Sequence, residues 1–130
     1  MRRVKLVRKA LTPRVKVWLE INGSYAFGHG LCEMLQAVEH AGSIKQAARD
    51  LGKSYRYVWG RIKEAEKTLG RQLVETQVGG KDAQRSCLTP EARQLAADFQ
   101  AVRLRIIQRV KDEFTQINAG LSSQQFLSRR

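Results

Sequence analysis

Small residues divide positions 31 to 70 into three predicted helices. Each apolar repeat of helical period ends at a glycine, which readily adopts the left-handed conformation that closes a helix. A serine follows each of the first two glycines within two positions, and its hydroxyl can accept a hydrogen bond from a free amide of the next helix. The expected helices are 31–41, 44–51 and 55–69, closed by Gly42, Gly52 and Gly70, with Ser43 and Ser54 as caps of the second and third.

The second and third helices have the composition of a helix-turn-helix. In that motif two helices cross steeply, so the first needs small residues at the crossing and a glycine in the turn. Ala47 and Ala48 supply the small contact, Leu51 the apolar anchor and Gly52 the turn. The third helix is apolar on one face and basic on the other, with no bulk at Gly60, so its basic face can enter a DNA major groove. The alternative is a three-helix bundle whose basic face is merely solvated.

Two hairpins are expected on either side of these helices. Asn22-Gly23, a strong signal for a two-residue hairpin turn, lies between two runs of strand-forming residues. A second pair of runs follows the third helix and encloses a polar, basic tip, as in the wing of a winged helix. The expected strands are 14–21 and 24–27, then 73–78 and 86–88, with the second tip at 79–85.

A long amphipathic helix is predicted to begin at Thr89-Pro90-Glu91 and to run to about Asn118. A capping hydroxyl, a proline at the first helical position and an acid in the first turn all favour this start. At about 1.5 Å per residue it would be roughly 43 Å long, more than a small domain needs for its own packing. Its surplus apolar face therefore predicts a dimer interface. The apolar row of this helix comprises Leu95, Phe99, Val102, Ile106, Val110, Phe114 and Ile117, and the residues predicted to need a partner are Phe99, Val102, Ile106, Val110 and Phe114.

Charge and length narrow the functional classes. The chain has 130 residues, with 24 Lys and Arg against 12 Asp and Glu and a net charge of +12, which favours a polyanionic partner such as nucleic acid. No apolar stretch approaches the roughly 18 to 20 residues of a membrane span, and no signal-peptide core follows the basic N-terminus. We expect a cytoplasmic protein.

The expected organisation has three parts. A flexible basic arm at 1–12 either touches phosphates or is simply solvated. A winged helix domain follows at 13–118, with its dimerisation helix at about 89–118, and a disordered tail occupies 119–130.

From Gly42 to about Ala96 the chain resembles the DNA-binding domain of the ModE family of molybdate-responsive regulators and, more distantly, that of LysR-type regulators. GSIKQAARDLG, LGRQLVE and LTPEA are LysR-like, whereas Ser54-Tyr55 followed by Trp59, and the wing with Gly79-Gly80-Lys81, are ModE-like. The resemblance implies a winged helix fold, dimerisation through the long helices and repression of molybdate-uptake or molybdoenzyme genes. The wing tip KDAQRS departs from the family's longer glycine run, and the family's C-terminal oxyanion-binding domains are missing from this sequence. We therefore expect that molybdate does not bind this chain alone.

The sequence thus predicts a mainly α protein with small β hairpins, a winged helix-turn-helix with a long C-terminal dimerisation helix. Its expected role is that of a sequence-specific DNA-binding transcriptional regulator, a repressor of molybdate-transport or molybdoenzyme genes. The alternative is a LysR-like or nucleoid-type DNA-binding protein, or an RNA-binding one, with no molybdenum link. The expected partner is double-stranded DNA with an inverted repeat, bound by a homodimer.

In this prediction Arg56 and Lys63 face the bases, Tyr57 and Lys67 face the phosphates, and the wing contacts the neighbouring backbone. The full set of predicted DNA-binding residues is Lys53, Ser54, Arg56, Tyr57, Gly60, Lys63, Lys67, Lys81 and Arg85.

Catalysis and metal binding are not expected. The chain has no nucleophile motif and no glycine-rich phosphate loop after a strand, so we expect neither an enzyme nor a cofactor. His29, Cys32 and His40 lie close in sequence but lack a second matching ligand pair. Tyr55 and Trp59, four positions apart, are predicted to be a packing pair, and a base-stacking platform is the alternative.

Overall fold

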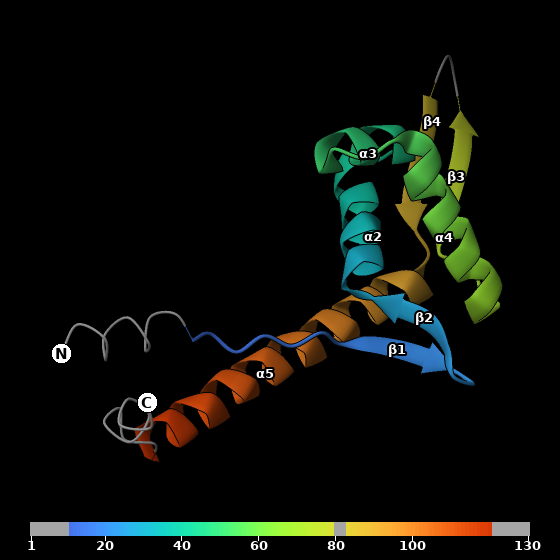
Figure 1. Ribbon diagram of the computed structural model, residues 1–130. Coiled ribbons are helices and arrows are strands. Elements are labelled where there is room, and N and C mark those ends of the chain that lie inside the picture. The colour runs from blue at the N-terminus through green and yellow to red at the C-terminus, as the bar shows by residue number, and fades with distance from the viewer. Residues whose placement is uncertain (1–10, 80–82, 121–130) are drawn as a thin grey trace. The chain divides into compact units, whose positions relative to one another are not determined.

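The computed structural model describes residues 11–79 and 83–120 and divides the chain into two compact units (Figure 1). One unit spans 17–101, and the other groups the residues before Val17 with those from Val102 onward. Most of the predicted basic arm and tail lies outside the described residues. The elements are β1 (Trp18–Ile21), β2 (Ser24–Gly28), α2 (His29–Ala41), α3 (Ile44–Leu51), α4 (Tyr55–Leu69), β3 (Val74–Gly79), β4 (Ala83–Leu88) and α5 (Pro90–Gly120).

The predicted glycine and serine punctuation is confirmed. The Ser43 hydroxyl accepts a hydrogen bond from the Gln46 amide, and the Ser54 hydroxyl accepts one from the Tyr57 amide, both at 3.0 Å. All three closing glycines are left-handed, with φ between 67° and 80°. Helix α2 begins at His29, two positions before the predicted start, because it follows β2 without a loop.

The core of the 17–101 unit lies between α2, α3, α4 and the start of α5. Ala47 and Ala48 are 0% and 2% exposed, and Leu51 packs against the same cluster, which confirms the predicted small contact between α3 and α4. Phe27 of β2 meets Phe99 of α5 edge to face, with ring centroids 5.2 Å apart. The aromatic pair joins the first hairpin to the first part of α5.

The turn of the first hairpin is the one predicted. Asn22 and Gly23 connect β1 to β2 and have φ angles of 51° and 81°. Two consecutive positive φ angles are typical of the type I′ turn, whose twist matches that of antiparallel strands.

The first strand is shorter than predicted. The alternating pattern indicated a strand from Arg14, whereas β1 begins at Trp18. Trp18 pairs with Gly28, the last residue of β2, so the residues before Trp18 have no partner in this two-stranded sheet. A strand extends only as far as a second strand supplies its hydrogen bonds. The alternating pattern of one segment does not show where that second strand ends.

The second hairpin, hereafter the wing, has longer strands than predicted. Strands β3 and β4 pair continuously from Val74 with Leu88 to Gly79 with Ala83. The predicted tip at 79–85 is therefore wrong, since only 80–82 remain between the strands, and these lie outside the described residues. Polar residues continue the ladder here because the outer part of β3 is exposed on both faces.

Helix α5 begins as predicted and ends at Gly120, two positions beyond the predicted end. The Thr89 hydroxyl accepts a hydrogen bond from the Ala92 amide at 3.1 Å. Ala92 and Ala96 are buried in the core of the 17–101 unit. Within the described residues, no helix combines the length and the apolar character needed to cross a membrane.

Candidate nucleic-acid interface

Helix α4 has three distinct sides. Val58, Ile62 and Ala65 are buried in the core. One flank, with Tyr55, Trp59 and Lys63, faces the wing across a cleft, and the other flank faces β2. The side farthest from the core is exposed and basic, as the helical period predicted. It carries Arg56, Gly60 and Lys67, whereas Lys63 and Glu64, which the helical period placed on the same face, lie on the two flanks.

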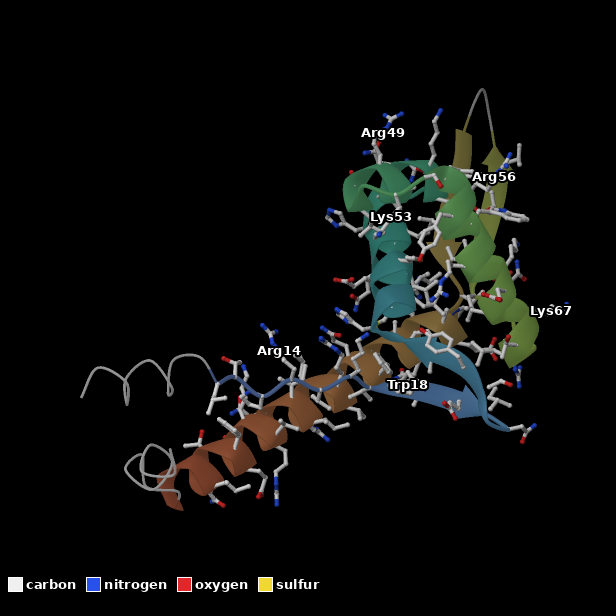
Figure 2. All side chains as sticks on the ribbon, viewed as in Figure 1. Arg14, Trp18, Arg49, Lys53, Arg56 and Lys67 are labelled. Carbon is white, nitrogen blue, oxygen red and sulfur yellow. The ribbon has the colours of Figure 1, made fainter. Side chains whose placement is uncertain are left out.

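The basic residues are spread along the length of α4. Figure 2 shows Arg49, Lys53 and Arg56 near the turn between α3 and α4, and Lys67 toward the opposite end of α4. All four side chains are exposed. The turn end therefore concentrates positive charge, because α3 and α4 both contribute to it there.

Arg56 is free to meet an external partner. Its side chain is exposed, and no hydrogen bond or ion pair of its guanidinium occurs among residues 11–79 and 83–120. Gly60, one turn further along, has open space where a side chain would begin. A glycine inside a helix costs about 1 kcal/mol relative to alanine, and no packing within the described protein requires one at this position.

Lys53 and Tyr57 contact each other beside Arg56. The Lys53 ammonium lies 5.7 Å from the centroid of the Tyr57 ring, and both side chains are exposed. Ser54 fixes the start of α4 through its bond to the Tyr57 amide. The structure thus brings Lys53, Ser54, Arg56 and Tyr57 together in one short segment.

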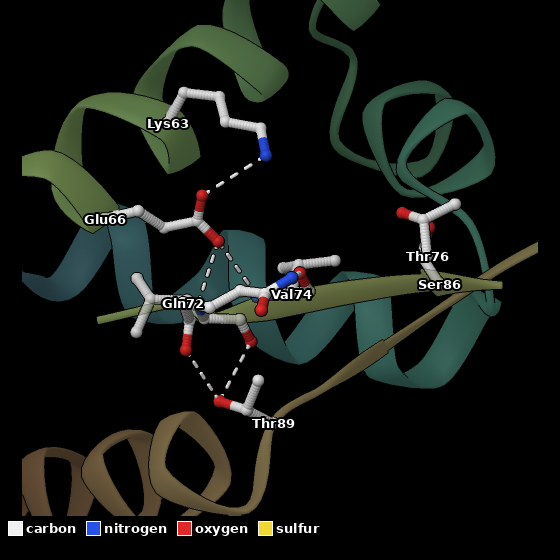
Figure 3. A network of polar contacts seen from close by, with 8 residues as sticks. Lys63, Glu66, Gln72, Val74, Thr76, Ser86 and Thr89 are labelled. Atoms are coloured by element: carbon white, nitrogen blue, oxygen red, sulfur yellow. Dashed lines mark hydrogen bonds and ion pairs between the residues drawn. The ribbon is translucent and has the colours of Figure 1, made fainter. Parts of the chain in front are cut away.

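Lys63 points toward the wing flank (Figure 3). Its ammonium lies 3.3 Å from the Glu66 carboxylate and 5.7 Å from the centroid of the Trp59 ring. The other oxygen of Glu66 accepts hydrogen bonds from the Leu73 and Val74 amides at 2.8 and 3.2 Å, which ties α4 to β3. Lys63 is therefore set apart from Arg56, although the sequence placed both toward the bases.

The two predicted wing residues differ in what the structure describes. Arg85 is exposed on β4, where it pairs with Gln77, rather than on a tip. Lys81 lies outside the described residues. Ser86, next to Arg85, donates its backbone amide to the Gly42 carbonyl at 2.8 Å, so the wing is also joined to the end of α2.

Part of the polar surface was not predicted from the sequence. Lys45 and Arg49 are exposed on α3 opposite its two alanines, and the helical period of 44–51 could have revealed them. Thr76 and Ser86 share a hydrogen bond of 3.1 Å on the wing beside α4. No local sequence pattern predicts that pair, since it depends on the register of the two strands and on how the wing packs against α4.

The aromatic residues of α4 do not form the predicted simple packing pair. Tyr55 and Trp59 are 49% and 43% exposed and line the cleft between α4 and the wing. Both rings are about half-exposed because their flank of α4 faces the cleft rather than the core.

Two of the three residues considered as metal ligands have other contacts, and the third, His40, is exposed on α2. His29 lies 3.5 Å from the Glu33 carboxylate, and Cys32 is fully buried with its sulfur 3.5 Å from the Ala96 carbonyl oxygen. In the part of the chain that the structure describes, no group of three or more His, Cys, Asp or Glu side chains is arranged to hold a metal ion.

Residues 30–93 match the model of the bacterial regulatory helix-turn-helix protein, lysR family. The match spans nearly all of α2, the α3–α4 pair, the wing and the first turn of α5. Over these residues, just under half of the chain, the protein is similar to a lysR-type helix-turn-helix domain. The LysR-like motifs noted in the sequence are thereby confirmed.

Relatives of the lysR-type domain include molybdenum-linked proteins. The chain is 32% identical over 85 residues to the molybdenum transport protein ModE of Herbaspirillum seropedicae, which covers 65% of this chain and 32% of that protein. It is 33% identical over 69 residues to the molybdenum-pterin-binding protein MopB of Rhodobacter capsulatus, covering 53% and 26%. It is 34% identical over 62 residues to the transcriptional regulator ModE of Haemophilus influenzae, covering 48% and 24%. The resemblance to ModE is confirmed, and the matched region spans about a third or less of each relative.

A solved structure shares the fold. The crystal structure of the BenM_DBD/catB site 1 DNA complex aligns with a TM-score of 0.52 at 22% identity, over 72% of this chain and 97% of that one. The predicted winged helix fold, mainly α with two small hairpins, is confirmed.

Proposed function

We propose that the chain is a sequence-specific DNA-binding transcriptional regulator whose lysR-type domain inserts α4 into the major groove. The observation that carries this proposal is the exposed face of α4 around Arg56 and Gly60. Arg56 has no partner among the described residues, and Gly60 leaves room that the protein itself does not fill. A major groove admits a helix, and an arginine there can hold a guanine through two hydrogen bonds.

The neighbouring residues suit the DNA backbone. Lys53, Ser54 and Tyr57 lie beside Arg56 and carry donors for phosphate oxygens. Lys67 lies toward the far end of α4 (Figure 2) and would meet a more distant phosphate. On the wing, Arg85 and Lys81 are proposed to contact the backbone next to the groove.

We propose a homodimer that uses the apolar row of α5. Val102 and Ile117 in that row are 48% and 57% exposed, and covering them needs a partner. A two-fold dimer that reads one side of the duplex should prefer an inverted repeat with half-sites about 10 base pairs apart, or multiples of that spacing.

The proposed targets are molybdate-transport or molybdoenzyme genes, and the proposed effect is repression. This rests on relatives named molybdenum transport protein ModE and transcriptional regulator ModE at 32% and 34% identity. Deleting the gene should raise expression of a reporter fused to such a promoter in the same organism. An unchanged reporter at every molybdate-linked promoter would remove the molybdenum link and leave a lysR-like regulator of other genes.

Calorimetric titration of the purified 130-residue chain with molybdate is expected to show no heat of binding.

The test of DNA recognition begins with a duplex selected from a random pool. Arg56→Ala should weaken binding to this duplex by about 1 to 3 kcal/mol and relax preference at one position in each half-site. Lys81→Ala should weaken all sequences alike and lower the salt slope by roughly one unit. Lys111→Ala, which removes one exposed charge from α5, is the matched control.

Gly60 offers a second, independent test. Gly60→Gln should raise the stability of the fold by up to about 1 kcal/mol through helix propensity, and it should weaken binding to the selected duplex by obstructing the groove. Equal affinity of the wild type for selected and random duplexes would contradict the proposal and favour a nucleoid-type protein.

A further inference from the structure

A cleft of about 200 Å³ separates α4 from the wing, with α3 at one end. If α4 enters the major groove and the wing contacts the backbone that borders it, as proposed above, the sugar–phosphate strand that separates this groove from the adjacent minor groove passes between α4 and the wing. That strand would cross the opening of this cleft. The proposed docking would therefore bring one backbone unit to this cleft.

The interior of the cleft suits a deoxyribose. Ile44, Ile62 and Val74 line it and are buried, at 8%, 0% and 5% exposed. The half-exposed rings of Tyr55 and Trp59 also line it. The three aliphatic side chains form the closed floor of the cleft, and the two rings offer the exposed surface that can pack against a sugar, which is favourable because it removes aromatic surface from water.

The polar residues of the cleft suit a phosphate. Thr76 and Ser86 share one hydrogen bond in which either hydroxyl can be the donor. When Ser86, which is 6% exposed, donates to Thr76, the exposed Thr76 hydroxyl keeps its own hydrogen for an external acceptor. Lys45 from α3 and Lys63 from α4 bring two positive charges to the same cleft.

Lys63 is oriented for this role by its own neighbours. The ammonium has three donors, and Glu66 accepts from it at 3.3 Å. Two donors remain for a phosphate, while Glu66 and the Trp59 ring hold the side chain on the wing side of α4. Lys63 is the more exposed partner of this pair, at 47% against 13% for Glu66, so the fixed carboxylate positions the lysine.

We propose that the cleft between α4 and the wing binds one deoxyribose-phosphate unit of the strand that separates the two grooves, with Lys45 and Lys63 as its phosphate ligands. This inference rests on the proposed DNA-binding function. It assigns Lys63 to the backbone and leaves base reading to Arg56. A free tetrahedral oxyanion shares the same chemistry, and the experiment below separates the two sources.

The test replaces single phosphates of a selected duplex by uncharged methylphosphonates, one position at a time. With the wild type, one position in each half-site between the two grooves should reduce affinity about tenfold or more, as expected for a lost hydrogen bond to a charged group. Lys63→Gln should bind the unmodified duplex more weakly than the wild type by a similar factor. The methylphosphonate at that same position should then lower the affinity of the variant by less than about twofold further. Lys111→Gln, the same change on α5, should keep the full penalty at that position.

Three results would overturn the inference. The first is that, at every position, the factor by which Lys63→Gln lowers affinity multiplies with the factor caused by the methylphosphonate, so that the two changes act independently. The second is that Lys63→Gln relaxes base preference in a selection experiment. The third is saturable micromolar binding of inorganic phosphate without DNA, read from Trp59 fluorescence in a Trp18→Phe background and lost in Lys63→Gln, which would assign the cleft to a free oxyanion.

Failure of the proposed function would look different. In that case the wild type itself would bind selected and random duplexes equally, and Arg56→Ala would change neither affinity nor preference. A thermal melt followed by circular dichroism confirms in each case that Lys63→Gln is folded, which we expect because Lys63 is exposed.

Discussion

The two parts of α5 have similar residues and opposite surroundings. From Pro90 to residue 101 the helix lies in the 17–101 unit, where Ala92, Ala96 and Phe99 are at most 3% exposed. From Val102 onward it belongs to the second unit, and Val102 is 48% exposed. One amphipathic repeat therefore serves two purposes, since the first part builds the core and the second part presents an apolar row.

This difference shows that an amphipathic repeat alone does not reveal whether its apolar face packs against the core of the same subunit or is left for a partner. Phe99 and Phe114 both belong to the apolar row predicted to form the dimer interface, but Phe99 is buried in the core of the 17–101 unit, so its assignment to the interface was wrong. The comparison can be tested with matched pairs of substitutions, one in each part of the helix or in the residue that contacts it.

The largest expected effect is that of Phe99→Ala. Removing a buried phenylalanine should lower the free energy of unfolding by about 3 to 5 kcal/mol, since it also ends the contact with Phe27. Denaturant unfolding should show this loss at every protein concentration. Phe114→Ala should cost much less at low concentration and more at high concentration, where the proposed dimer forms. A concentration-independent loss of similar size for both would erase the distinction between the two parts.

Next in size is Ile106→Glu, in the middle of the second part. A charge in the apolar row should raise the dissociation constant of the dimer at least about 100-fold, or about 2.7 kcal/mol, as measured by sedimentation equilibrium. Leu104→Glu is the matched control, because Leu104 is 52% exposed and lies off the row. If Leu104→Glu separated the subunits and Ile106→Glu did not, the interface would lie on another face.

Thr89→Ala should have a smaller effect. The buried Thr89 hydroxyl accepts from the Ala92 amide and donates to the Gln72 carbonyl at 2.9 Å, so its loss should cost about 1 to 2 kcal/mol of stability. Thr115 also has a hydrogen-bonded hydroxyl, to the Lys111 carbonyl, but it is exposed. Thr115→Ala should change stability by less than about 0.5 kcal/mol in thermal melts. Equal losses would show that burial of the cap does not matter.

The smallest expected effect is a pH dependence from Glu39. The Arg93 guanidinium on the first part of α5, and then the Leu88 amide, lower the pKa of the Glu39 carboxylate. A lowered pKa in the folded state stabilises the protein above the unfolded pKa of about 4.3. This stability is lost as the pH falls through the folded pKa.

Glu39→Gln should therefore be less stable than the wild type at pH 7, and the two proteins should converge as the pH falls below about 4. Glu113, paired with Arg109 at 3.0 Å on the exposed second part, supplies the control, and Glu113→Gln should change the stability at pH 7 by less than about 0.5 kcal/mol, as expected for an exposed ion pair on a helix. A gap between Glu39→Gln and wild type that stayed constant down to pH 2 would contradict the ion-pair explanation.

Much of the helical framework was predictable because it depends on residues a few positions apart. The Ser43 and Ser54 caps, the Asn22-Gly23 turn and the Thr89 start all involve hydrogen bonds or φ angles within about four residues. The exposed basic face of α4 was predictable for the same reason, since it follows from the helical period. Each of these features can therefore be found in a short window of sequence.

The remaining features required segments distant in sequence to meet. The length of β1 depended on where β2 ends, and the bounds of the wing depended on strand register. The orientation of Lys63 depended on Glu66, whose second oxygen is held by the amides of β3. A single segment has no information about such partners.

The sequence by itself determined the helices, their caps and the basic, glycine-containing face of α4, because local hydrogen bonds and helical periodicity suffice for them. The tertiary structure decided which half of α5 is buried, and it decided that Lys63 turns to a cleft shared with Thr76 and Ser86. The physical reason is that burial and side-chain orientation are set by the partner surface, and that surface exists only once α4, the wing and α5 have packed.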